Sequence, residues 1–279
     1  MPSSRDRQLR WSWVVGRVVW TTLGVAFTAA MLAPLGCLLL YSLADRFSPT
    51  AAMPPAYSLR WYERFAADPH ALGALLTSLG VAALATILAL AVGLPAAWAL
   101  AGMRTWAAPV VEFALLLRAA APVIVVALGS AVLAYRFRLD DTWLAVVLAH
   151  AAGSLPFVVW SVQPALEGLD PEADAAARDL GAGPARRLAL MLRGIMPALL
   201  AGALFAFLFS MDEFAVTFLI AGQRLVTLPI LLYGALQSSS VQAASAVAVI
   251  LVAPSALLTL AVARAIGDWE RVLGTGWLR

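Results

Sequence analysis

Two acidic residues inside a long apolar run are the first feature of the sequence that could do chemistry. Asp212 and Glu213 are adjacent and follow Ser210, with apolar residues on both sides. Neighbouring residues on a helix point about 100° apart, so both carboxylates cannot line one narrow path. We expect one to face a water-filled path and attract a cationic solute while the other binds neighbouring helices; a structural role for both is the alternative. Ser210, Asp212 and Glu213 are therefore the candidate path residues.

The other polar residues in apolar runs do not form a catalytic pattern. The sequence contains no HExxH or GxSG motif, and Cys37 is its one cysteine. It also contains no lysine, the residue with which a P-loop reaches nucleotide phosphates. His150 and Ser154 are expected to be hydrogen-bonded core groups, and Arg118 needs a partner that the sequence does not name. We predict that the chain is not an enzyme and holds no metal and no cofactor.

Composition places these residues in a membrane. Of the 279 residues, 62% are apolar and 13% charged, and the mean hydropathy is +0.87. A soluble domain is nearer half apolar and a quarter charged. A bilayer core needs about 20 apolar residues for each helix. Six runs meet this requirement: Val18–Leu43, Ala71–Leu100, Ala107–Tyr135, Thr142–Val162, Ile195–Ala221 and Ala243–Ile266. The predicted fold is an all-α polytopic membrane protein with six transmembrane helices.

Arginine counts on alternate loops predict the orientation of these spans. Twelve arginines fall on the side that holds both termini, and six fall on the other side. The richer side is expected to be cytoplasmic, so the basic charge reflects topology rather than nucleic-acid binding. We predict a cytoplasmic segment over residues 1–17, one permease domain over 18–266 with a cytoplasmic loop over 163–194, and a cytoplasmic tail over 267–279. The first span is expected to be an uncleaved anchor.

The cytoplasmic loop has the signals of two short helices. Asp170 is expected to cap the first helix with Pro171 in its first turn, and acidic residues follow near the positive end of the helix dipole. An alanine-rich stretch then continues to Leu180, and Gly181 with Pro184 should end it. Residues 185–192 can form a second helix.

This loop resembles the cytoplasmic EAA loop of permease subunits in binding-protein-dependent ABC importers. The family pattern places EAA three residues before a glycine and an I-x-L-P sequence nine residues after it. Gly181 fits the glycine, preceded by Ala176, Ala177 and the stretch Arg178-Asp179-Leu180. The chain departs from the pattern with Ala175 at the glutamate, Asp174 one position earlier, and Met191 and Arg193-Gly194 at the later sequence. The resemblance implies that ATPase-coupling residues are Asp174, Ala176, Ala177, Arg178, Asp179 and Gly181.

Three further stretches extend the resemblance along the chain. Residues Tyr57–Tyr62, Ser210–Phe214 and Thr227–Tyr233 are similar to segments of polyamine-type permeases, and their order fits the second permease subunit of spermidine/putrescine importers. Related subunits for phosphonate, thiamine or ferric iron share much of the pattern, and these substrates are alternatives.

The resemblance implies a type I importer permease fold in the bacterial inner membrane. It further implies a dimer of ATPase subunits, a second permease subunit in a homo- or heterodimer, and an extracytoplasmic solute-binding protein as partners. Other classes of function that fit a six-span chain are a self-contained secondary transporter and an intramembrane enzyme. The first of these would leave the cytoplasmic helix pair without a task, and the second lacks its motifs.

Overall fold

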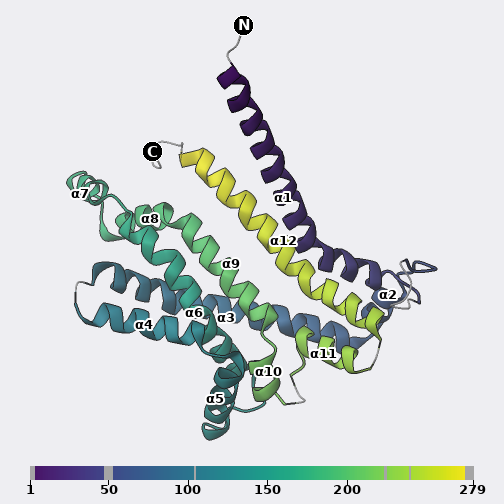
Figure 1. Cartoon of the computed structure of the whole chain (residues 1–279). Coiled ribbons are helices and arrows are strands. Elements are labelled where there is room, and N and C mark those ends of the chain that lie inside the picture. Colours follow the sequence, from purple (N-terminus) through teal and green to yellow (C-terminus); the bar gives the residue numbers. More distant parts are fainter. Residues whose placement is uncertain (1–3, 47–52, 104, 223–224, 239, 274–279) are drawn as a thin grey trace.

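The chain folds as a set of helices, many of which run along one another at shallow angles (Figure 1). The computed structural model describes residues 4–46, 53–103, 105–222, 225–238 and 240–273. The helices within these ranges are α1 (Ser4–Ser42), α2 (Arg60–Ala67), α3 (Pro69–Gly102), α4 (Ala107–Ala120), α5 (Val123–Arg136), α6 (Trp143–Glu167), α7 (Pro171–Asp179), α8 (Pro184–Gly194), α9 (Met196–Asp212), α10 (Ala215–Ile220), α11 (Leu228–Gln237) and α12 (Val241–Leu273). The all-α prediction is confirmed.

Four of these helices are long and apolar enough to cross a membrane alone. Their spanning parts are Val19–Ser42 of α1, Pro69–Gly102 of α3, Trp143–Glu167 of α6 and Val241–Trp269 of α12. Two bent pairs, α4 with α5 and α8 with α9, bring the number of candidate spans to six when each pair counts as one. The structure therefore holds four to six candidate spans. Because α8 lies within the predicted cytoplasmic loop over 163–194, the fifth predicted span corresponds to α9 and α10 rather than to the α8–α9 pair.

The third predicted span, Ala107–Tyr135, is wrong as a continuous helix. It divides into α4 and α5, which meet at an angle of 104°. Pro122 has no backbone N–H and disfavours the helical conformation of the residue before it, and Ala121 is indeed extended, with φ −64° and ψ 138°. Each half has 14 residues, which is about 21 Å of helix and less than the thickness of a bilayer core.

The fifth predicted span, Ile195–Ala221, is interrupted near its end. Helix α9 ends at Asp212, and α10 begins at Ala215 after an extended Glu213 with φ −74° and ψ 106°. At its other end, α9 follows α8 with a bend of 66°. The interruption lies at the candidate acidic residues, so it decides how their side chains are placed.

The first and last helices are longer than their predicted spans. Helix α1 begins at Ser4 and α12 continues to Leu273, so the boundaries expected after residues 17 and 266 fall inside helices. In Figure 1, the start of α1, the end of α12 and the pair α7–α8 lie toward one end of the molecule, and α2 lies toward the other. This arrangement has the two ends that the predicted topology requires.

Close packing of α3, α6 and α9 forms the centre of the molecule. Small residues allow these helices to approach, as is common in membrane bundles. A Cβ atom added at Gly93 of α3 would lie 2.7 Å from Val158 Cγ1 of α6, and one added at Gly202 of α9 would lie 3.3 Å from Val158 Cα. Val158 is fully buried between them. The glycines thus fix the spacing of the three helices on which the candidate path residues depend.

Polar contacts hold α2 at the end of α1. Arg60 forms an ion pair of 2.6 Å with Asp45, and the indole Nε1 of Trp61 donates to the carbonyl of Ala44 at 3.0 Å. The hydroxyl of Tyr62 lies 2.7 Å from that of Ser42. The stretch Tyr57–Tyr62 therefore leads from a backbone bridge between Tyr57 and Ala44 into the first turn of α2, and these contacts fix it to the end of the first span.

Reporter fusions test the predicted topology. A reporter joined after Arg193, between α8 and α9, is expected to behave as cytoplasmic because the arginine-rich side is retained inside. One inserted at Asp140, between α5 and α6, is expected to behave as external. Paired phosphatase and fluorescent-protein activities measure both positions, and a cytoplasmic signal at Asp140 would contradict the orientation.

Candidate functional site

The turn between α7 and α8 is built from local backbone signals. The Asp170 carboxylate accepts a hydrogen bond from the Glu172 amide at 2.8 Å and caps α7, as predicted. At the other end, the amide of Ala182 donates to the carbonyl of Ala177 at 2.9 Å, and that of Gly181 to Arg178 at 2.8 Å. This pair of bonds is a Schellman motif, in which the residue at Gly181 adopts the left-handed conformation. Its φ is +76°.

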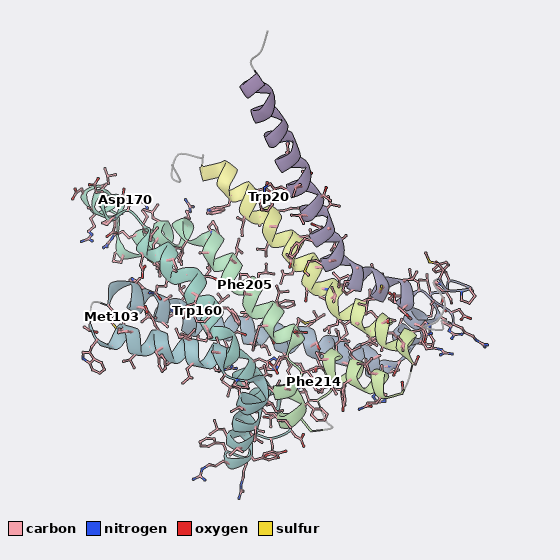
Figure 2. All side chains as sticks on the ribbon, viewed as in Figure 1. Trp20, Met103, Trp160, Asp170, Phe205 and Phe214 are labelled. Atoms are coloured by element: carbon pink, nitrogen blue, oxygen red, sulfur yellow. The ribbon has the colours of Figure 1, made fainter. Side chains whose placement is uncertain are left out.

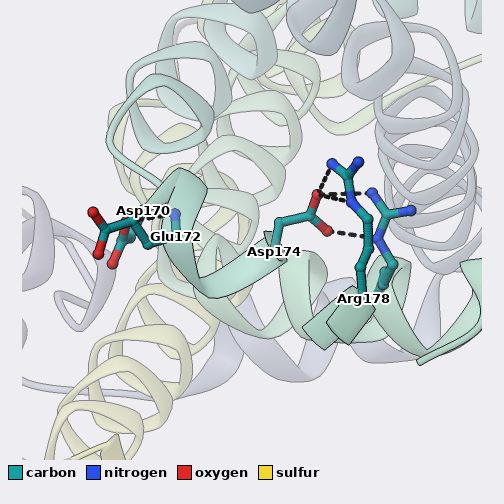
Figure 3. Close-up of polar contacts among 5 residues, drawn as sticks. Asp170, Glu172, Asp174 and Arg178 are labelled. Carbon is teal, nitrogen blue, oxygen red and sulfur yellow. Dashed lines mark hydrogen bonds and ion pairs between the residues drawn. The ribbon is translucent and has the colours of Figure 1, made fainter. Parts of the chain in front are cut away.

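One carboxylate joins the two short helices (Figure 3). Asp174 of α7 accepts hydrogen bonds from Arg178, four residues later, with Nη2 at 2.6 Å, and from Arg187 of α8, with Nε at 2.6 Å and Nη2 at 2.7 Å. The hydrogen bonds from Arg187 and then Arg178 hold the pKa of Asp174 well below its usual range. The carboxylate therefore stays ionised throughout the neutral range, and the α7–α8 pair keeps its shape there.

The remaining predicted coupling residues lie around this ion-pair cluster. Within α7, Ala177 is buried, whereas Ala176 and Asp179 are exposed. Two residues that the sequence reasoning missed join them: Arg187, thirteen positions from Asp174, and Leu180, whose side chain is 88% exposed at the turn. Leu180 directly precedes the family glycine in a polar loop, and this position could have indicated a contact surface. No sequence pattern indicated that Arg187 would bind Asp174.

The turn at Gly181 gives the first test of the coupling surface. A Cβ atom at this position would have open space around it, so substitution acts through the backbone conformation, at a cost of about 1–2 kcal/mol for an ordinary residue. We expect Gly181→Glu to reorient the turn and reduce co-purification of the ATPase, with an unchanged yield of permease in membranes. Gly181→Asn, which tolerates positive φ, is the matched control and should keep most binding. Full co-purification with Gly181→Glu would contradict a docking role.

The contact between Asp174 and Arg187 gives a second test of the coupling surface. Arg187→Gln removes the bonds that join α7 to α8, so we expect weaker ATPase binding and faster amide hydrogen exchange in α7. Arg186→Gln, which removes an exposed charge next to it, should change neither property. Equal loss of binding in both variants would mean that charge alone, rather than the shape of the helix pair, carries the effect.

A second candidate site is a pocket of about 710 Å³ beside the interruption between α9 and α10. Four aromatic rings line it: Phe157 of α6, Phe205 and Phe209 of α9, and Phe214. Figure 2 labels Phe205 on α9 and Phe214 at the start of α10. The centroid of Phe157 lies 5.6 Å from that of Phe209 and 6.5 Å from that of Phe205, so these three rings form one cluster. Phe214 stacks instead on Phe218. Asp212 and Glu213 are the charged residues of its lining.

The two acids have different surroundings, as expected for neighbouring residues whose side chains point in different directions. The Asp212 side chain is exposed, whereas Glu213 is 8% exposed. Glu213 Oε1 accepts a hydrogen bond from the amide of Val216 at 2.9 Å, and its own carbonyl oxygen accepts one from the hydroxyl of Thr217 at 3.3 Å. Glu213 thus satisfies backbone groups that the interruption frees, and Asp212 is left facing the pocket.

A buried polar network fixes both sides of the interruption to α6. His150 of α6 contacts the Ser210 hydroxyl through Nδ1 at 2.7 Å and the Thr217 hydroxyl through Nε2 at 2.8 Å. The Ser154 hydroxyl donates to the carbonyl of His150 at 2.8 Å. The prediction that His150 and Ser154 are satisfied core groups is confirmed. Ser210, named as a path candidate, is buried and binds His150.

Arg118 occupies a notch on α6. Its guanidinium Nη2 lies 2.7 Å from the position that a Cβ atom would take at Gly153, and the Phe209 ring lies 2.5 Å from the same position. A side chain at Gly153 would therefore displace one of them. Among the described residues no ion pair involves Arg118, and its place is set by Gly153 and Phe209. The sequence could not name these neighbours because they are far from Arg118 along the chain and lie on different helices.

Comparison with known proteins shows to which family the chain belongs. Residues 85–272, more than half of the chain, match the family of the binding-protein-dependent transport system inner membrane component. The chain belongs to this family. It is a multi-pass inner-membrane transport permease rather than an enzyme, and the resemblance found in the sequence is confirmed.

Several relatives of known transport systems share about a third of their residues with this chain over the matched parts. The sulfate transport system permease protein CysT of Salmonella typhimurium is 35% identical over 138 residues, which cover 48% of this chain and 50% of the relative. The putrescine transport system permease protein PotI of Escherichia coli is 29% identical over 232 residues, covering 79% and 80%. The spermidine/putrescine permease protein PotC of the same species is 29% identical over 208 residues, covering 74% and 78%. The chain thus matches about half the length of the sulfate permease.

A solved structure confirms the fold. A bacterial ABC transporter involved in the import of the acidic polysaccharide alginate contains a chain that aligns with a TM-score of 0.70. The alignment covers 95% of this chain and 98% of that chain at 18% identity. At this identity the likeness concerns the arrangement of the helices, and it establishes the importer permease fold.

Proposed function

We propose that this permease forms half of the translocation path for a small cationic solute of polyamine type. The observation that carries the proposal is the exposed carboxylate of Asp212 within a pocket walled by phenylalanine rings. Aromatic faces and a carboxylate together attract cations that are partly desolvated. The similarity to putrescine and spermidine/putrescine permeases over about three quarters of the chain supports the same substrate class.

A second candidate is a small oxyanion such as sulfate. The match to a sulfate permease at 35% identity favours it, and so does the guanidinium of Arg118 close to the same pocket. An arginine is the usual ligand for an oxyanion. This candidate is second because Arg118 is half-buried and does not line the pocket, whereas Asp212 is exposed and lines it.

We propose that the partners are those of an ABC importer. The α7–α8 pair, with Leu180 exposed at its turn, is the surface for a cytoplasmic ATPase dimer, and both termini lie on that side. A second permease subunit completes the path, as a homo- or heterodimer, and a solute-binding protein delivers the solute to the opposite end. The rigid Asp174 cluster supports this assignment, since a coupling element must transmit motion without deforming.

Transport by two acid variants tests the solute class. Asp212→Asn removes the exposed charge and keeps its shape, so we expect uptake of labelled putrescine or spermidine to fall by about tenfold with assembly unchanged. Glu213→Gln weakens the acceptor for the buried amide of Val216, so we expect lower thermal stability of the purified complex as its first effect. The measurements are uptake into vesicles that hold the complete complex, and its melting temperature.

Two results would contradict the proposal. Full polyamine uptake by Asp212→Asn would remove the electrostatic argument. Uptake of labelled sulfate, with none of putrescine or spermidine, by the unmodified complex would assign the second candidate instead.

A further inference from the structure

One histidine of α6 contacts both sides of the interruption between α9 and α10. Nδ1 of His150 lies 2.7 Å from the hydroxyl of Ser210, in the last turn of α9, and Nε2 lies 2.8 Å from the hydroxyl of Thr217, in α10. All three side chains are buried. Because buried polar groups are almost always hydrogen-bonded, each proton in this group needs an acceptor within the protein.

The contacts of Thr217 determine where the proton of the imidazole lies. Its hydroxyl has one proton, which it donates at 3.3 Å to the carbonyl of Glu213, an acceptor that the end of α9 frees. The same hydroxyl must therefore accept a hydrogen bond from His150, and Nε2 must carry a proton.

The contact of Ser210 determines the state of the other ring nitrogen. Among the described residues, the Ser210 hydroxyl makes one hydrogen bond, with Nδ1 of His150. A charged imidazole would donate from both nitrogens and leave the proton of this hydroxyl without an acceptor. A neutral ring with a bare Nδ1 accepts that proton. The hydrogen bonds therefore run in one direction, from Ser210 through His150 and Thr217 to the carbonyl of Glu213.

This chain of hydrogen bonds spans the position of Asp212. Helix α9 ends at Asp212, α10 begins at residue 215, and Glu213 between them is extended. No helix continues across this gap, so the relative placement of its two ends depends on contacts with other parts of the protein. His150 provides such a contact on each side.

The part of α6 that carries His150 is itself fixed to α9. The Ser154 hydroxyl, four residues later, contacts the carbonyl of His150 at 2.8 Å and that of Ala206 of α9 at 3.3 Å. Ser154 is as deeply buried as the histidine, but its contacts lie on the α9 side of the interruption alone. It is therefore a matched control for a buried hydrogen bond that does not bridge the gap.

We propose that His150 is a positioning residue for transport, a neutral imidazole with its proton on Nε2 that holds Ser210 and Thr217 and so keeps Asp212, rather than Glu213, exposed at the pocket. His150 is 2% exposed and does not touch the solute. Ser210, a candidate path residue, gains a role without contact with the solute. The inference rests on the proposed function only in treating the pocket as part of the path.

Nuclear magnetic resonance measures the position of the proton. The sequence contains two histidines, so His70→Gln, at an exposed position, leaves His150 alone. The full chain is labelled with ¹³C,¹⁵N-histidine and studied in lipid bilayers. We expect a protonated nitrogen bonded to Cδ2, which is Nε2, and a bare nitrogen bonded to Cγ, which is Nδ1. A proton on Nδ1, or on both nitrogens, would overturn the inference.

Two conservative variants test the bridge in the complete complex in membranes. His150→Asn retains a polar group near the position of Nδ1, and His150→Gln retains one near Nε2, so each keeps one side of the bridge. Carbodiimide modification is followed at Asp212 and Glu213, and we expect the ratio of the two rates to fall by about threefold to tenfold in both variants. Ser154→Ala should lower the melting temperature and leave this ratio unchanged.

Variants of the two partners show through which side each change acts. Ser210→Ala should lower the ratio as His150→Gln does and add little to it, and Thr217→Val should pair in the same way with His150→Asn. If the histidine variants do not assemble, these two variants carry the test.

Two further results would overturn the inference. One is an unchanged ratio in every variant of the bridge, and the other is an equal fall in Ser154→Ala, since the histidine would then have a structural role alone. Neither measurement requires a solute. Absence of polyamine uptake by the unmodified complex would therefore contradict the proposed solute, and the proton position and the ratio would still decide the role of His150.

Discussion

Backbone polar groups inside a membrane protein must find partners within the protein, because lipid offers none. The interruption between α9 and α10 is the place where this constraint is most demanding. Two side chains meet it: Glu213 accepts from the amide of Val216, and Thr217 donates to the carbonyl of Glu213. His150 then binds the hydroxyls of Thr217 and Ser210 on the two sides. A buried polar group left without a partner costs about 1–3 kcal/mol. The interruption is therefore a stable part of the fold, fixed to α6.

The placement of charge follows from that interruption. A continuous helix would carry Asp212 and Glu213 at adjacent positions of one regular surface. With Glu213 extended, its carboxylate is buried against the amide of Val216, and the carboxylate of Asp212 is exposed at the aromatic pocket. The same residues thus provide a structural anchor and an available charge. At the opposite side of the molecule, Asp174 has the comparable role of joining two short helices into a rigid unit.

Local signals made part of this structure predictable from sequence. Helix α7 is an example: its N-cap is Asp170, Pro171 lies in its first turn, and Gly181 is the left-handed residue after its end. Each of these signals depends only on residues a few positions away along the chain. The spans follow from length and composition. Pro122 was a sequence signal that permits a kink, but the apolar run on both sides still predicted one span, since hydropathy reports burial in lipid and not helix continuity.

The rest depends on contacts between distant positions. His150 and Ser210 are 60 residues apart, and Arg187 is 13 residues beyond Asp174 across a turn. The notch that receives Arg118 requires Gly153 of α6 and Phe209 of α9 to meet. No local pattern encodes such pairings, because they arise only when three helices pack at one spacing. The difference between Asp212 and Glu213 belongs to this class.

That difference is the central claim, and carboxyl labelling tests it most directly. The complete complex in membranes is treated with a water-soluble carbodiimide and an amine, and modification at each residue is followed by mass spectrometry. The structure predicts rapid modification of Asp212, which is exposed, and protection of Glu213, which is buried and hydrogen-bonded. Modification of Glu213 as fast as Asp212, or faster, would contradict the account.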